Sequence, residues 1–113
     1  TQISSLSLDY NMICGVDKHG RGTSFTLNAI NMLCEALPKC NLTSLSISGN
    51  AIGVKGGTKL AEVLPLTKIT TLDLDNNQIC DVFFCFKIEA INKICDTLPN
   101  TNITSLRCNL LSL

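Results

Sequence analysis

Residues 42–52 read LTSLSISGNAI, and this pattern of apolar residues and asparagine recurs along the chain. Its apolar fourth and sixth positions alternate with polar ones, which is typical of a short strand with one buried face. The full copies are Ile3-x-x-Leu6-x-Leu8-x-x-Asn11-x-Ile13, Leu42-x-x-Leu45-x-Ile47-x-x-Asn50-x-Ile52 and Ile69-x-x-Leu72-x-Leu74-x-x-Asn77-x-Ile79. A fourth copy begins with Ile103, Leu106 and Cys108 but carries Leu111 where the asparagine belongs.

A second block follows each full copy and has helical spacing. Its apolar residues recur at steps of three and four, and each block ends in Leu-Pro. Proline ends a helix because it donates no backbone hydrogen bond and disfavours helix at the preceding residue. The blocks are marked by Ile30, Leu33 and Leu37-Pro38, by Gly57, Leu60 and Leu64-Pro65, and by Ile91, Ile94 and Leu98-Pro99.

The distance between successive copies varies, because residues are added between strand and helix. The first positions are 39, 27 and 34 residues apart, and the shortest unit sets the frame. The additions follow Ile13 and Ile79 and amount to 12 and 7 residues. We predict one domain, residues 1–113, with repeats at about 3–41, 42–68, 69–102 and 103–113.

This pattern, with an amphipathic helix after each strand, resembles the leucine-rich repeats, specifically the ribonuclease-inhibitor-like subfamily. The resemblance covers residues 3–113. It implies an α/β solenoid with a curved parallel sheet on the concave side and helices on the convex side. Neither end carries a polar capping repeat, so three full repeats and a partial fourth are expected to belong to a longer array.

The resemblance also implies a role. Similar repeats serve as scaffold, sensor or inhibitor modules, so we expect a protein-protein interaction module that binds on its concave face or insertion loops. The alternative is a regulator of a small GTPase, similar to the GTPase-activating members of the subfamily. Asp75, Asn76 and Arg21 are the candidate contacts for that activity. No nucleophile-base pair occurs in register with the repeats, so an enzyme acting alone is not expected.

The composition favours a buried core and argues against two classes of partner. Apolar residues make up 45% of the chain and charged residues 16%, with nine basic and nine acidic residues. The balanced charge argues against nucleic acid or an anionic membrane as partner. No long apolar segment or secretory leader is recognisable. Seven cysteines is an odd number, which favours reduced thiols and a cytoplasmic location.

Several residue types that often carry chemistry have a structural interpretation here. Asn11, Asn50 and Asn77 are expected to form a ladder that satisfies backbone groups. Cys34, Cys95 and Cys108 are expected to pack in the core.

No metal or cofactor site is expected. Cys14-x4-His19 and Cys80-x4-Cys85 do not have a recognised zinc-binding spacing. The glycine-rich segment 15–22, with His19, lacks the Gly-Lys-Ser/Thr sequence of a phosphate-binding loop and is expected to be solvated.

Partner binding is predicted at side chains that alternate with the buried strand residues and face away from the helices. The candidates on this face are Ser7, Asp9, Ser46, Ser48, Asp73, Asp75 and Arg107, and Tyr10 and Asn76 flank it.

All four phenylalanines lie in the two additions. Asp81 would cap a longer third helix, and Thr23 or Ser24 would begin the first helix. Phe25 and Phe84 would then be core residues, with Phe83 or Phe86 more exposed. The alternative is an aromatic lip that grips a partner.

Overall fold

The computed structural model describes residues 3–16, 22, 24–79 and 88–109. Within them the chain alternates strands with helices, and each helix continues into a short 3-10 turn. The elements are β1 (Ser5–Ser7), α1 (Asn28–Ala36), η1 (Leu37–Lys39), β2 (Ser44–Ser46), α2 (Gly53–Val63), η2 (Leu64–Leu66), β3 (Thr71–Asp73), α3 (Glu89–Thr97), η3 (Leu98–Asn100) and β4 (Ser105–Arg107).

The strands form one parallel sheet in the order β1-β2-β3-β4. The register joins equivalent positions of the sequence pattern: Leu6 pairs with Leu45, Leu45 with Leu72, and Leu72 with Leu106. The added residues after Ile13 and Ile79 therefore do not shift the pairing. The α/β class predicted from the sequence is confirmed.

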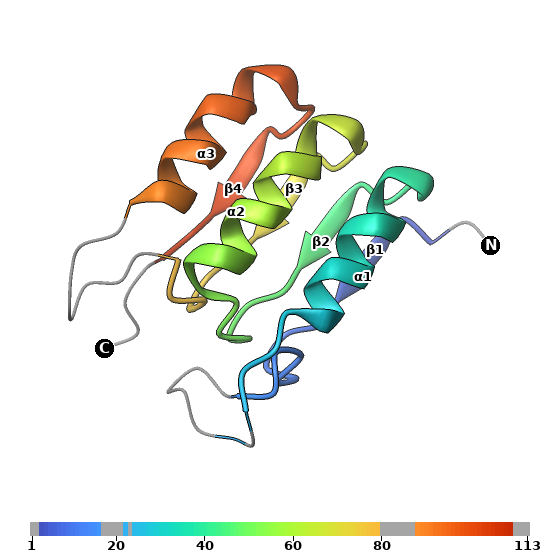
Figure 1. Cartoon of the computed structure of the whole chain (residues 1–113). Coiled ribbons are helices and arrows are strands. Elements are labelled where there is room, and N and C mark those ends of the chain that lie inside the picture. The colour runs from blue at the N-terminus through green and yellow to red at the C-terminus, as the bar shows by residue number, and fades with distance from the viewer. Residues whose placement is uncertain (1–2, 17–21, 23, 80–87, 110–113) are drawn as a thin grey trace.

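The three helices lie on the same face of the sheet (Figure 1). Leu45 and Leu72 point toward them and are buried, together with Leu60 of α2 and Ile94 of α3. Burying each such side chain contributes roughly 1.5–3 kcal/mol. The core therefore lies between sheet and helices and leaves the opposite sheet face for polar residues.

Each α-helix ends where the Leu-Pro pair predicts. The proline occupies the first turn of each 3-10 segment, and the following chain is extended at Cys40, Thr67 and Thr101. The chain then enters the next strand.

The predicted starts of the helices are wrong. α1 begins at Asn28, not at Thr23 or Ser24, because the preceding residues bond to the turn after β1. The Thr26 N–H donates to the Cys14 carbonyl at 2.9 Å, and the Thr26 hydroxyl accepts from the Asn28 N–H at 3.2 Å. Gly15 allows this approach, since a Cβ there would clash with the Ser24 carbonyl.

The third helix is also shorter than predicted. α3 begins at Glu89, and Ile88 has non-helical angles of φ −114° and ψ 10°. The predicted cap Asp81 lies outside the described residues, as do Phe83, Phe84 and Phe86.

The predicted asparagine ladder is present at Asn50 and Asn77, whereas the Asn11 side chain is exposed and only its backbone N–H takes part. Asn50 donates its side-chain amide to the carbonyls of Leu8, Ile47 and Ser48, and its Oδ1 accepts from the N–H groups of Asn11 and Ile13. Asn77 repeats the arrangement one unit later, and its Oδ1 accepts from the Asn50 N–H at 2.9 Å. Both side chains are buried, so they satisfy polar backbone groups that water cannot reach.

The cysteine prediction is correct in part. Cys34 is buried in the core and Cys108 is half-buried, but Cys95 is exposed. Cys95 has the same position on α3 as Cys34 has on α1. α2 packs beside α1, whereas no helix among the described residues follows α3 to cover Cys95.

Candidate partner-binding surfaces

The sheet face opposite the helices, called the open sheet face below, carries polar side chains from every strand. Outward-facing positions flank the central leucine of each strand, which is buried in β2 and β3 and half-buried in β1 and β4, and none of the flanking positions is fully buried. These residues are Ser5, Ser7, Ser44, Ser46, Thr71, Asp73, Ser105 and Arg107. No element among the described residues covers them (Figure 1).

Asp9 connects the first two strands on this face. Its Oδ1 accepts from the Ser46 hydroxyl at 2.6 Å and from the Ser48 N–H at 2.7 Å. Partial burial acts to raise the pKa of Asp9, but hydrogen bonds from Ser46, Ser48 and Ser7 together hold that pKa below its ordinary value. The carboxylate is thus a structural acceptor that holds neighbouring strands.

Asp75 connects the third and fourth strands as Asp9 connects the first two. One carboxylate oxygen accepts from the Asn109 N–H at 2.7 Å, and the other lies 3.1 Å from an Arg107 guanidinium nitrogen. Arg107 remains largely exposed beside this ion pair. Asp73 supports the turn, since its Oδ1 accepts from the Asp75 N–H at 3.0 Å.

Tyr10 and Asn76 meet across the backbone of Gly49. The Asn76 amide donates to the Tyr10 hydroxyl at 3.1 Å, although 66 positions separate them in sequence. Tyr10, Gly49 and Asn76 occupy equivalent frame positions, and all three have positive φ angles of 56°, 69° and 60°. A Cβ on Gly49 would overlap the Tyr10 ring, so the glycine makes room for the aromatic side chain.

The structure therefore groups the nine predicted residues. Ser7, Ser46 and Ser48 surround Asp9, Tyr10 meets Asn76, and Asp75 joins Asp73 and Arg107. One expectation is wrong: Ser48 and Asp75 do not face solvent but are only 5% and 8% exposed. Both lie just past the strands, where the turn encloses them.

Among the candidates for GTPase contact, Asp75 and Asn76 form interactions within the chain, and Arg21 lies outside the described residues.

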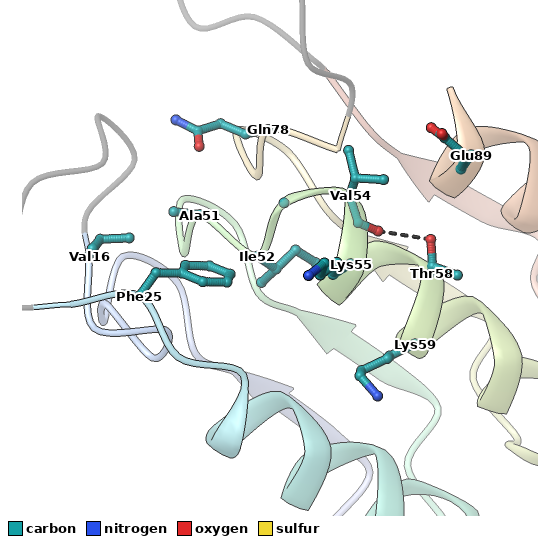
Figure 2. A pocket seen from close by; sticks show the side chains of 11 residues that line it. Val16, Phe25, Ala51, Ile52, Val54, Lys55, Thr58, Lys59, Gln78 and Glu89 are labelled. Atoms are coloured by element: carbon teal, nitrogen blue, oxygen red, sulfur yellow. Dashed lines mark hydrogen bonds between the residues drawn. The ribbon is translucent and has the colours of Figure 1, made fainter. Parts of the chain in front are cut away.

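A second surface, missed by the residue list from the sequence, is a depression beside the first addition. It has a volume of about 740 Å³ and lies between that addition and the N-terminus of α2. Figure 2 shows Val16 and Phe25 on one side, Val54 and Glu89 on the other, and Ile52 between them. The depression is called the Phe25 pocket below.

Phe25 corrects the preferred sequence interpretation. It is not a core residue but is 48% exposed, because residues 24–27 are not helical and present the ring at the pocket wall. The clustering of phenylalanine in the additions was the available signal for such a surface. The Lys55 and Lys59 side chains, which border the same pocket, gave no signal because lysine on an exposed helix face is common.

Other site chemistry is sparse in the part of the chain that the structure describes. There, no group of three or more His, Cys, Asp or Glu residues is placed to hold a metal ion. The helices found there are also too short and too polar to cross a bilayer. His19, Cys80 and Cys85 fall outside the described residues.

Comparison with known proteins does not assign the chain. No protein-family model matches the sequence, and no curated protein is significantly similar to it.

Proposed function

We propose that this chain is a leucine-rich-repeat solenoid of the ribonuclease-inhibitor-like type and acts as a protein-protein interaction module. The family proposal is supported by the sequence frame and by the way each frame position recurs in space. Leu6, Leu45, Leu72 and Leu106 align across the sheet. The second positive-φ residue of each turn also recurs, at Met12, Ala51 and Gln78.

The binding proposal rests on one observation: the open sheet face is a continuous polar surface of four strands without a covering element among the described residues. Parallel sheets are ordinarily covered on both faces by their own chain. A sheet face left uncovered along a row of repeats is the usual binding surface of repeat proteins. The partner is a protein, docked across β2 and β3.

The test places large charged side chains on the open sheet face without disturbing its internal bonds. Ser44 and Thr71 are paired neighbours on β2 and β3, and neither side chain forms a described hydrogen bond. The variant Ser44→Arg/Thr71→Arg is compared with Met32→Arg/Glu62→Arg, which changes exposed positions on the helices. Affinity capture is followed by quantitative mass spectrometry.

We expect the wild type and the helix variant Met32→Arg/Glu62→Arg to capture equal amounts of a partner protein. The sheet variant Ser44→Arg/Thr71→Arg should capture at least about tenfold less, a difference of ~1.4 kcal/mol in binding free energy. Equal retention by both variants would discredit the open sheet face as the binding surface. Circular dichroism of each variant establishes that the fold is kept.

A further inference from the structure

The Phe25 pocket combines an apolar wall with an exposed ring. Ile52 forms a fully buried floor, and Val16 lines the side nearest the first addition. Phe25 stands half-exposed at the wall. Burial of such a ring against a partner's apolar side chain is favourable, since aromatic residues dominate interface energetics.

The charge at the pocket rim has one predominant sign. Lys55 and Lys59 are exposed, one helical turn apart on α2, and both border the pocket. In the described part of the chain neither forms an ion pair, whereas Arg107 does. Among the described lining residues Glu89 is the acidic one, and it lies across from the lysines at the start of α3.

The backbone adds to the positive potential at the pocket. α2 begins at the pocket with Gly53, has no acidic residue in its first turn and has no side-chain cap. The Gly53 N–H donates to the Asn77 carbonyl at 2.8 Å and the Gly56 N–H to the Ile52 carbonyl at 3.1 Å, so the partial positive charge of this helix end is carried mainly by the N–H groups of Val54 and Lys55. Thr58 does not supply a free donor, because its hydroxyl donates to the Val54 carbonyl at 2.8 Å (Figure 2).

We infer that the Phe25 pocket is a second docking surface, which binds an acidic segment of a partner protein by one apolar side chain. The apolar side chain lies against Phe25 and the half-buried Val54, above the buried Ile52, and carboxylates on either side of it pair with Lys55 and Lys59. The charge of the rim argues for acidic flanks, and the apolar wall argues for the anchoring side chain. This surface is separate from the open sheet face and does not depend on it.

The probe is a fluorescein-labelled decapeptide pool with leucine, isoleucine, methionine or phenylalanine at the centre and glutamate at four flanking positions. A second pool replaces the glutamates with lysines, and a third replaces the central residue with serine. Fluorescence anisotropy with the 113-residue chain measures binding at low and physiological salt. The acidic apolar pool is expected to bind at least tenfold more tightly than the other two.

The variants locate the binding. Lys55→Glu/Lys59→Glu is expected to weaken binding of the acidic pool at least tenfold, and Phe25→Ser about fivefold. The matched control is Lys39→Glu/Lys68→Glu, which reverses two exposed lysines at the other ends of the helices and is expected to change binding less than twofold. Thermal unfolding of each variant checks that it folds.

Backbone amide NMR shifts separate this inference from the proposed function. Shifts at Gly53, Val54 and Thr58 on titration with the acidic pool support the inference. Shifts confined to Ser46 and Asp73 would place the peptide on the open sheet face and overturn it. Absence of binding by the acidic pool, or equal binding of the acidic and basic pools, would also overturn it. Concentration-dependent shifts at Gly53 without peptide would assign the pocket to a second copy and overturn it as well.

Discussion

The side-chain amide of Asn76 donates a hydrogen bond to the hydroxyl of Tyr10, and the two residues hold equivalent positions in the first and third repeats. The bond passes over the second repeat, whose own equivalent residue is Gly49. Three successive turns are thereby linked on the edge of the open sheet face. The bond also fixes the only tyrosine of a chain that contains no tryptophan, so tyrosine fluorescence reports on Tyr10 alone.

Replacing Gly49 tests this arrangement. Gly49→Ala adds a Cβ that overlaps the Tyr10 ring, in addition to the cost of a positive φ angle. We expect a loss of about 2 kcal/mol in unfolding free energy and an altered tyrosine emission. Gly53→Ala is the control, because its φ is 70° but no atom lies within 4 Å of the added Cβ. It should cost about 1 kcal/mol and leave the emission unchanged. Equal effects of the two substitutions would contradict the contact with Tyr10.

The ladder makes Asn50 more important for stability than Asn11, although both fill the same sequence position. Asn50→Ala removes the buried amide that bonds Leu8, Ile47 and Ser48, so several backbone groups lose their partners. Urea unfolding should show a loss of about 3 kcal/mol. Asn11→Ala changes an exposed side chain and should cost less than about 0.5 kcal/mol. Similar losses for both would be incompatible with the ladder.

The lowered pKa of Asp9 predicts a pH-dependent contribution to stability. Burial favours the neutral carboxyl, but hydrogen bonds from Ser46, Ser48 and Ser7 favour the ionised form more strongly. The folded-state pKa of Asp9 therefore lies below the ordinary value of 3.8. The contribution is therefore present above the unfolded-state pKa and is lost as pH falls through the folded-state pKa. Asp9→Asn should cost about 1 kcal/mol at pH 6 and progressively less below pH ~4. Urea unfolding from pH 2.5 to pH 7 measures this; a cost that does not vary with pH would contradict it.

Cysteine reactivity distinguishes buried from exposed thiols. Burial raises the pKa of Cys14, and burial is also the main cause of the raised pKa of Cys34, with Lys59 opposing and Glu62 adding to it. Cys40 and Cys95 are exposed. Iodoacetamide labelling of the folded chain, mapped by mass spectrometry, should modify Cys40 and Cys95 at least about tenfold faster than Cys14 and Cys34. Rapid modification of Cys34 would contradict its place between α1 and α2.

The repeated frame was sufficient to predict the strands, the parallel sheet and the ends of the helices. Each of these depends on local patterns: alternation around Leu45 and Leu72, and proline after Leu37, Leu64 and Leu98. The asparagine ladder was also predictable, because a buried turn leaves backbone groups that an amide can satisfy.

Features that depend on distant contacts were not predictable. α1 starts late because Thr26 bonds to Cys14, and spacing within the helix cannot reveal that bond. Cys95 repeats the position of Cys34, but no described helix follows α3 to cover it as α2 covers Cys34. Asp75 fits an outward-facing position, yet it is buried because it bonds to Asn109 beyond β4. The Phe25 pocket likewise requires the first addition and α2 to come together.

The central claim is that a protein partner docks on the open sheet face, and site-specific photo-crosslinking tests it most directly. Benzoylphenylalanine is placed at Thr71 on β3 in one variant and at Met32 on α1 in another, both exposed positions. The account predicts a covalent protein adduct from Thr71 and none from Met32, with the Thr71 adduct abolished by Ser44→Arg in the same chain. An adduct from Met32 alone, or a Thr71 adduct that Ser44→Arg leaves unchanged, would contradict it.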